Sequence, residues 1–280
     1  MGAYYRPEKL DDALTILNET GARVAAGCTD LFPATSARSL DGPVLDVTGI
    51  GALRGIRVTN DGIRIGAATT WTDVIRAELP MAFDMLKQAA REVGSVQIQN
   101  AGTIAGNLCN ASPAADGVPC LLALDAQVEL ASGAGVRRLA LSDFITGVRK
   151  TALLPGEMVV AVHVPGDACA GRSRFRKLGA RRYLVISIAM VAARLVVDSG
   201  LVRQAAVAVG ACSAVAVRLP ALEQALVGQP LKSAADLAED NLVAPALAPI
   251  ADIRSDAAYR RHAAGELVRR SLSDLAEGST

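Results

Sequence analysis

The stretch Val96–Asp116, VQIQNAGTIAGNLCNASPAAD, constrains the fold most, because it is long, rich in small residues and charged only at Asp116. It lacks the 3.6-residue alternation of apolar and charged positions that a surface helix shows. Gly, Asn and Pro interrupt it too often for a regular strand. We therefore expect a loop threaded through the interior of the protein.

The backbone amides of such a loop need partners, because a buried unpaired amide costs about 1–3 kcal/mol. A bound anion such as a phosphate would satisfy several amides at once, and small side chains would let it approach closely. The alternative is a packing loop of Gly and Ala that binds no ligand. The residues by themselves leave both interpretations open.

The size and charge of the chain narrow its class. It has 280 residues, enough for two domains, and a net charge of +1 from 29 basic and 28 acidic residues. Without a charged tail we expect no nucleic acid or membrane-surface partner. No apolar run reaches about 20 residues, so we expect no membrane span. The N-terminus also lacks a secretory signal.

The five cysteines are widely spaced and form no C-x-x-C pair, which argues against a disulfide framework and against a zinc or iron–sulfur site. Reduced thiols in a cytoplasmic protein are the expected state.

Hydrophobic periodicity predicts an α+β chain. The predicted helices cover 11–18, 71–78, 81–92, 220–227, 233–238 and 256–275, with a short helix or turn at 119–124. The predicted strands cover 23–25, 44–47, a hairpin at 55–66, 127–130, 136–139, 158–164, 173–178, 186–197 and 201–209. The composition changes near Pro165–Gly171, the candidate domain boundary. Beyond it we expect a three-stranded antiparallel sheet with helices on one face.

The chain offers no clear catalytic group. It has no Walker loop, no complete Rossmann glycine pattern, no G-x-S-x-G and no metal-binding motif, and we interpret His163 and His262 as structural. We therefore predict no catalytic residue and no metal ligand in this chain. Strand 23–25, the turn at Gly27 and a helix start near Leu31 could form a second anion site, or an ordinary strand-to-helix connection. Anion-binding loops without catalytic side chains suit redox work, in which a cofactor does the chemistry.

Three motifs in order resemble one family. GTIAGNL (102–108) followed by NASPAAD (110–116) resembles the second flavin-binding loop of the FAD subunit of molybdenum hydroxylases, the family of xanthine dehydrogenase and carbon monoxide dehydrogenase. AAGCTDL (25–31) resembles its first loop, and FRKLGARRYLVISI (175–188) resembles the segment that opens its C-terminal domain. The resemblance implies a two-lobed FAD-binding domain of the PCMH/vanillyl-alcohol-oxidase-like type at 1–168, with lobes at about 1–54 and 55–168. A C-terminal CO-dehydrogenase-flavoprotein-like domain would cover 171–280.

The resemblance also implies the site. Backbone amides of 23–30 and 102–107, with the Thr29 and Thr103 hydroxyls, would hold the FAD pyrophosphate. Asp116 would accept a hydrogen bond from a ribityl or ribose hydroxyl. The apolar Met158 would lie against the cofactor. Lys177 would lie near the flavin ring and raise its reduction potential; the alternative is a solvated strand residue. The implied FAD-binding residues are Arg23, Val24, Ala25, Ala26, Gly27, Cys28, Thr29, Asp30, Gly102, Thr103, Ile104, Ala105, Gly106, Asn107, Asp116, Met158 and Lys177.

Two departures from the family pattern stand out. Its double glycines are here Gly27-Cys28 and Ala105-Gly106. If Cys28 or Ala105 must adopt a positive φ, each costs about 1–2 kcal/mol; otherwise these positions need only a small side chain. Val185 stands where the family has Asp, and we assign it no role.

The implied activity is electron transfer within an oxidoreductase that hydroxylates an N-heterocycle, an aldehyde or a similar small molecule. Electrons would pass from a molybdopterin cytosine dinucleotide or similar centre on a large subunit, through two-iron two-sulfur clusters on a small subunit, to this FAD. They would then reach NAD, a quinone or oxygen, in a heterotrimer or a dimer of heterotrimers. The alternatives are a free-standing FAD-dependent oxidoreductase and a scaffold subunit without flavin.

Overall fold

The computed structural model describes residues 2–37 and 40–278, so the ends of the predicted domains, residues 1 and 279–280, lie outside it. The helices are α1 (Leu10–Thr20), α2 (Trp71–Arg76), α3 (Asp84–Glu92), α4 (Val96–Ala101), α5 (Ile104–Asn110), α6 (Gly117–Ala123), α7 (Leu141–Phe144), α8 (Pro220–Leu226), α9 (Asp240–Val243) and α10 (Ala257–Glu277). Short 3-10 turns are η1 (Gly51–Leu53), η2 (Met81–Phe83), η3 (Gly166–Cys169), η4 (Leu231–Ser233) and η5 (Ala244–Ala246).

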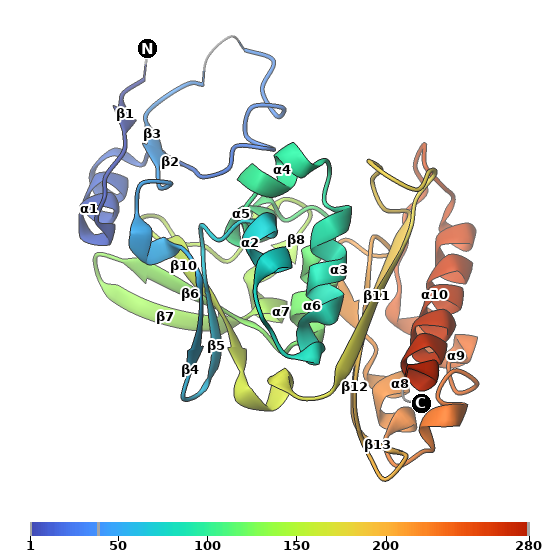
Figure 1. The fold of residues 1–280 in the computed structure, drawn as a ribbon. Helices are drawn as coiled ribbons and strands as arrows, with labels where there is room; N and C mark the ends of the chain where they lie inside the picture. Colours follow the sequence, from blue (N-terminus) through green and yellow to red (C-terminus); the bar gives the residue numbers. More distant parts are fainter. Residues whose placement is uncertain (1, 38–39, 279–280) are drawn as a thin grey trace.

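The strands form four sheets (Figure 1). They are β1 (Tyr4–Tyr5), β2 (Arg23–Ala25), β3 (Val44–Asp46), β4 (Ile56–Thr59), β5 (Gly62–Gly66), β6 (Gln127–Ser132), β7 (Gly135–Ala140), β8 (Ile145–Gly147), β9 (Lys150–Thr151), β10 (Met158–Pro165), β11 (Arg172–Leu178), β12 (Ala189–Asp198), β13 (Leu201–Gly210) and β14 (Val217–Arg218).

The N-terminal part has two lobes. In the first, β1, β3 and β2 form a parallel sheet, and α1 turns Ala13, Leu14 and Leu17 inward and ends at Gly21 with φ 59°. In the second, the antiparallel order is β4-β5-β10-β6-β7. The central strand β10 is almost entirely buried, because α5 packs on it and β5 and β6 flank it. Thr70 caps α2 in a reciprocal capping box with Asp73.

The C-terminal sheet contains β11, β12, β13 and a short fourth strand, β14, in addition to the three predicted. Its two faces belong to different cores. Met190 and Ala192 of β12 pack into the core of the N-terminal part, while Val191 and Ala193 pack into a second core with α8 and α10. We expected helices on one face of this sheet. Helices cover both faces, because α8 and α10 pack on the side of the second core and α3 and α6 cover the opposite face. This sheet therefore lies between the core of the N-terminal part and the helices of the C-terminal part (Figure 1).

The expected interior loop at Val96–Asp116 is wrong in conformation. The segment holds two short helices, α4 and α5, separated at Gly102-Thr103, and the Ser95 and Thr103 hydroxyls cap them. Each has at most seven residues, too few for an amphipathic stripe to show in the sequence. Val96 is 65% exposed, so α4 also reaches the surface.

Other predicted boundaries shifted. The helix predicted at 233–238 is wrong, since only η4 and turns form there. The helix at 81–92 divides into η2 and α3, and β12 begins at Ala189, three residues later than predicted. Within the part of the chain that the structure describes, no helix combines the length and apolarity needed to cross a bilayer.

Candidate functional site

The two predicted anion loops lie against each other. A Cβ built on Gly27 would lie 1.8 Å from the Ala101 carbonyl oxygen and 2.9 Å from the Gly102 Cα. A Cβ on Gly102 would lie 3.4 Å from Thr29 Oγ1. Backbone therefore packs directly on backbone, and glycine is required at position 27. The structure thus brings segments 23–30 and 102–107 together although more than seventy residues of chain separate them.

The first loop keeps unused hydrogen-bond donors. Among the residues that the structure describes, the backbone amides of 27–30 have no acceptor. Cys28 has φ 56°, which is the left-handed backbone conformation. At the corresponding position the family pattern has glycine, which adopts this conformation without strain. The expected helix start near Leu31 forms only a turn, closed by the Phe32 amide on the Cys28 carbonyl and the Ala34 amide on the Asp30 carbonyl.

The second loop uses its backbone amides internally except that of Thr103, which has no acceptor among the described residues. The Ile104 and Ala105 amides donate to the Thr69 and Ala67 carbonyl oxygens at 3.0 and 3.2 Å. The Gly106 amide donates to Thr103 Oγ1 at 3.0 Å, and the Asn107 amide to the Thr103 carbonyl. Ala105 lies inside α5 and not among the positive-φ residues, so its replacement of glycine causes no strain.

Side chains of the second loop still carry free hydrogen-bonding groups. Asn107 Oδ1 is buried and has no partner among the described residues. The Thr103 hydroxyl accepts from Gly106, yet its own hydrogen has no described acceptor. A buried amide oxygen without a partner costs about 1–3 kcal/mol, which a bound ligand would recover.

Asp116 forms a buried group with two residues of the C-terminal part. Lys177 Nζ donates to its Oδ2 at 2.6 Å, and Ser187 Oγ donates to its Oδ1 at 2.6 Å. The side chains of Lys177 and Asp116 are only 8% and 7% exposed, so Lys177 is not a solvated strand residue. Burial raises the pKa of the Asp116 carboxyl, and Lys177 and Ser187 oppose that rise.

Met158 belongs to the five-stranded sheet of the N-terminal part. It is the first residue of β10, packs in the N-terminal core and is 3% exposed. Ser187 has no role among the site residues that the sequence implies, although it lies within the 175–188 segment that carries the resemblance. Its position within that segment is the only feature of the sequence that could have indicated it, because no neighbouring residue shows that its hydroxyl contacts Asp116.

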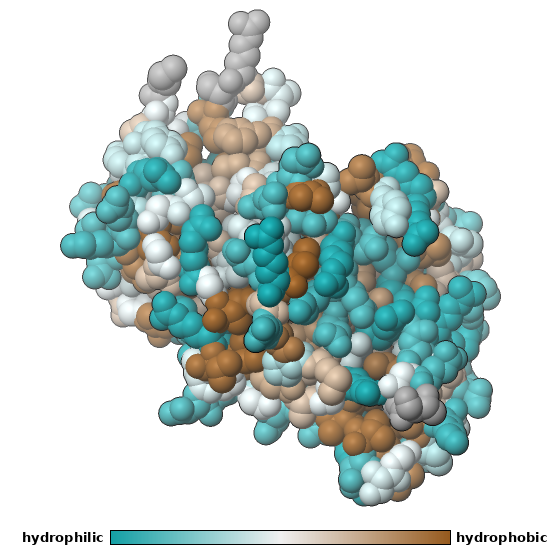
Figure 2. Space-filling view, in the orientation of Figure 1, coloured by the Kyte–Doolittle hydropathy of each residue, from teal (hydrophilic) through white to brown (hydrophobic). Residues whose placement is uncertain are grey.

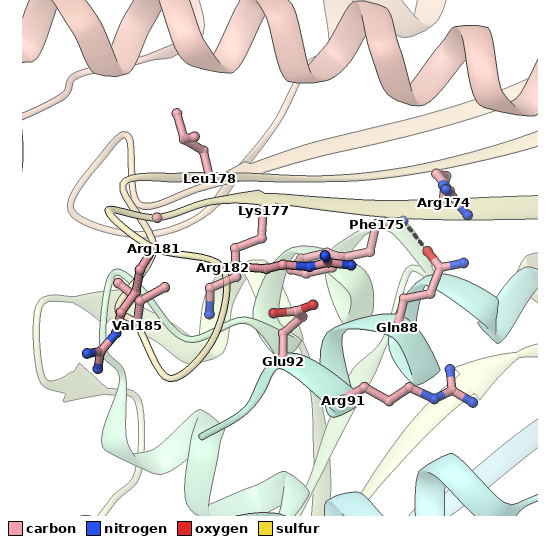
Figure 3. A pocket seen from close by; sticks show the side chains of 11 residues that line it. Gln88, Arg91, Glu92, Arg174, Phe175, Lys177, Leu178, Arg181, Arg182 and Val185 are labelled. Atoms are coloured by element: carbon pink, nitrogen blue, oxygen red, sulfur yellow. Dashed lines mark hydrogen bonds between the residues drawn. The ribbon is translucent and has the colours of Figure 1, made fainter. Parts of the chain in front are cut away.

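A cavity of about 490 Å³ lies beside Lys177 (Figure 3). It is lined by α3, by the end of β11 and by residues 179–185, including Arg91, Glu92, Arg182 and Val185. Figure 2 shows the surface hollowed between α4 and the loop that joins β11 to β12. The five cysteines are free, and the described residues contain no group of three or more metal-binding side chains.

The fold and the facing glycine loops define a flavin-binding domain with a second domain packed against it. The family model described as the FAD binding domain in molybdopterin dehydrogenase matches residues 1–167. The model described as the CO dehydrogenase flavoprotein C-terminal domain matches residues 174–275. The chain belongs to the family of FAD-binding subunits of the molybdenum hydroxylases, which are oxidoreductases, and the resemblance found in its motifs is confirmed.

Two relatives match nearly the whole chain. The xanthine dehydrogenase FAD-binding subunit of Escherichia coli O157:H7 is 30% identical over 97% of this chain and 95% of its own length. The carbon monoxide dehydrogenase medium chain of Afipia carboxidovorans is 31% identical over 96% of this chain and 94% of its own.

Solved structures show the same fold. A chain of the reconstituted CO dehydrogenase from Oligotropha carboxidovorans superposes with a TM-score of 0.92 at 29% identity, covering 99% of this chain and 98% of that one. A chain of quinoline 2-oxidoreductase from Pseudomonas putida 86 gives 0.89 at 26% identity, covering 100% and 98%. The predicted α+β architecture is therefore confirmed.

The residues present fit FAD, the cofactor of this family. The unpartnered Asn107 oxygen is an acceptor, which a hydroxyl group of the cofactor would satisfy. The free amides at 27–30, beside the Gly27 contact that leaves no room for a side chain, form a surface of unused donors. Such a surface suits the diphosphate of a dinucleotide.

Proposed function

We propose that this chain is the medium subunit of a molybdenum hydroxylase that oxidises an N-heterocycle, an aldehyde or a similar small molecule. It would receive electrons from a large molybdopterin subunit through a small iron–sulfur subunit, and pass them from FAD to an acceptor. The names of the matching relatives, which include xanthine and carbon monoxide dehydrogenase subunits, support this assignment. The proposed domains are 1–168 and 171–280, joined near η3, and a cytoplasmic location stays a prediction.

The observation that carries the proposal is the contact of Gly27 with Ala101 and Gly102, beside amides that have no described acceptor. In the proposed site, the first loop (23–30) donates backbone hydrogen bonds to the diphosphate. The second loop (102–107) contributes the hydroxyl and the backbone amide of Thr103 and the Asn107 side chain, because the amides of 104–107 already have protein acceptors. Charge-assisted hydrogen bonds of this kind contribute about 1.5–3 kcal/mol each.

Asp116, Lys177 and Ser187 would join the two domains at the flavin. FAD supplies the capacity to take up and release electrons, and the protein sets its affinity and potential. The buried ammonium of Lys177 would favour the anionic reduced form of a nearby ring and so raise its reduction potential. Met158 would remain an apolar neighbour within the core.

The first test is the double variant Thr103→Val with Asp116→Ala. We expect it to lose FAD, measured as the ratio of flavin absorbance near 450 nm to protein. A matched control is Thr15→Val with Asp198→Ala, since both residues are exposed and lie on α1 and at the end of β12. Stoichiometric flavin in the double variant would contradict the proposed site.

The second test is Lys177→Ala in flavin-loaded protein. We expect a lower midpoint potential and slower transfer to NAD, because the ring loses a neighbouring positive charge. An unchanged potential removes the role proposed for Lys177.

A free-standing oxidoreductase is the competing function. Anaerobic mixing of the isolated flavoprotein with candidate substrates separates the two, since rapid flavin reduction without partner subunits favours the competitor. Slow reduction that becomes fast when the other subunits are added supports the proposed function.

A further inference from the structure

Arg260 is a buried arginine that has no part in the proposed site. It lies in the first turns of α10, after the Asp256 cap, and is only 3% exposed. Its Nη1 donates to the Ile188 carbonyl oxygen at 2.6 Å and to the Ala211 carbonyl oxygen at 3.1 Å. Its Nη2 donates to Asp252 Oδ1 at 2.7 Å. One side chain therefore fixes two backbone carbonyls from different segments.

The first of these carbonyls is tied to the Asp116 group, that is Asp116 with Lys177 and Ser187. Ser187 directly precedes Ile188 in the chain, and the Ile188 amide donates to the Leu178 carbonyl oxygen at 2.7 Å. Leu178 in turn follows Lys177, and Figure 3 shows the two side chains pointing to opposite sides of β11. Holding Ile188 therefore holds the backbone next to both residues that donate to the Asp116 carboxylate.

The second carbonyl leads to the Asp116 group along another path. Ala211 follows β13 with φ 62°, and its amide donates to the Pro113 carbonyl oxygen at 2.9 Å. Pro113 lies three residues before Asp116 in the chain. The Arg260 guanidinium thus holds both segments that meet at this carboxylate, the one that carries its donors and the one that carries the carboxylate itself.

Ser187 depends on such support because no strand ladder positions it. Residues 179–188 form no helix or strand, and β12 begins at Ala189. Ser187 is nevertheless 1% exposed and donates to Asp116 Oδ1 at 2.6 Å. A hydroxyl in an irregular segment keeps one direction only if the neighbouring peptides are fixed. Arg260 supplies this restraint one residue away, since a guanidinium presents its donors in a rigid planar arrangement.

Burying this guanidinium is costly, which argues against a role in packing alone. Its Nε is buried and has no partner among the described residues. Apolar side chains of similar volume often stabilise such positions better than a buried ion pair does. The Arg254 amide and then the Arg260 guanidinium lower the pKa of Asp252 to about 2, against the opposing effect of burial, so the pair is ionised at neutral pH. Arg260 therefore contributes mainly through the direction of its hydrogen bonds.

We propose that Arg260 is a positioning residue for the Asp116 group. By holding two backbone carbonyls, it keeps the Lys177 ammonium and the Ser187 hydroxyl on the Asp116 carboxylate, although it touches none of these side chains. The consequence for flavin rests on the proposed function. A displaced Lys177 would no longer place its charge beside the ring, so both the affinity for FAD and its reduction potential would fall.

The first test is a double-mutant cycle in the flavin-free chain, followed by urea unfolding. We expect Arg260→Gln to shift the urea midpoint less in a Ser187→Ala background than in the parent, because both changes loosen the same group. Leu272→Ala, a fully buried change on the same helix, should shift it equally in both backgrounds. Additive effects of Arg260→Gln and Ser187→Ala overturn the proposal.

A milder variant keeps this cycle decisive if Arg260→Gln does not fold. Asp252→Asn leaves Arg260 in place and removes its carboxylate partner, whose side chain is 24% exposed. We expect the same non-additivity with Ser187→Ala, at a smaller size. Additivity of this pair overturns the proposal in the same way.

The second test uses the flavin-loaded complex. Arg260→Gln should weaken FAD binding about tenfold or more and lower the midpoint potential. The change in potential should nearly vanish in a Lys177→Ala background, and Leu272→Ala should leave the potential unmoved. An unchanged potential in Arg260→Gln, or an equal shift with and without Lys177, overturns the proposal. A parent chain that binds no FAD refutes the proposed function instead, and the flavin-free cycle then decides whether Arg260 positions the Asp116 group.

Discussion

The two loops that face each other at the cofactor site look alike in sequence and differ in structure. Each is rich in small residues and each has a non-glycine residue where the family has a double glycine. The first loop is open, with Cys28 at φ 56° and no described acceptor for the amides of 27–30. The second is the start of a helix, and the amides of 104–107 have protein acceptors.

The difference teaches that small residues serve two purposes here. In the first loop, glycine at position 27 allows the close approach to the Ala101 carbonyl oxygen, and the amides of 27–30 have no described acceptor. In the second, Thr103 caps α5 and accepts from Gly106 and Asn107, while the Ile104 and Ala105 amides donate to the Thr69 and Ala67 carbonyls. A diphosphate between the loops would therefore meet four free backbone amides in the first loop, and mainly side chains with the Thr103 amide in the second.

The largest effect is expected from Gly27→Ala. Its Cβ would fall on backbone atoms that cannot rotate away, so we expect a loss of about 3 kcal/mol in the free energy of unfolding, with loss of flavin. Urea unfolding and flavin absorbance measure both. Gly51→Ala is the control, because a Cβ there meets no atom within 4 Å. Equal, small effects at both positions would mean that the loops do not touch as described.

The next effect separates the roles of the two threonines. Thr103→Val removes the cap of α5 and should cost about 1 kcal/mol of stability in the flavin-free chain. Thr29→Val should leave that stability nearly unchanged, since its hydroxyl has no hydrogen-bond partner among the described residues. Both variants should bind FAD more weakly. If both lose the same stability without flavin, the contrast between the loops is wrong.

Glycine substitutions should have opposite signs in the two loops. Cys28→Gly relieves a left-handed backbone and should stabilise the protein by about 1 kcal/mol. Ala105→Gly places glycine in a helix and should destabilise it by about 0.5–1 kcal/mol. Thermal or urea unfolding of the pair decides the matter. If both substitutions changed the free energy of unfolding in the same direction, the different backbone conformations of the two loops would have no effect on stability.

The smallest effect expected is on the pH dependence of stability. The second small-residue stretch ends in buried Asp116, while the first ends in exposed Asp30. Burial raises the native pKa of Asp116, with Lys177 and Ser187 offsetting part of it. Between the ordinary pKa of about 3.9 and the raised native pKa, the native state binds more protons than the unfolded state. The contribution of Asp116 to the free energy of unfolding therefore falls as the pH rises.

Asp116→Asn should remove that slope, and Asp30→Asn should not. Urea midpoints measured from pH 4 to 7 give both slopes. An unchanged slope in the Asp116 variant would show that its carboxyl titrates normally in the folded protein.

Prediction succeeded where a few neighbouring residues hold the whole signal. The hairpin at 55–66 formed as predicted, because its tight turn depends on contacts between near neighbours in the sequence. The motifs also identified the family correctly. Prediction failed for α4 and α5, since helices of this length are stabilised by caps and packing and show no periodicity of their own.

The sequence by itself determined the order of local elements, the family and the small size of the side chains at the loops, because steric and capping preferences act over a few residues. Only the tertiary structure decided which donors stay free, which face of β12 each core covers, and that Asp116 meets Lys177 and Ser187 from 61 and 71 residues away. Those outcomes depend on packing between distant segments. A buried polar group takes whichever partner the fold brings within reach, and no local pattern encodes that choice.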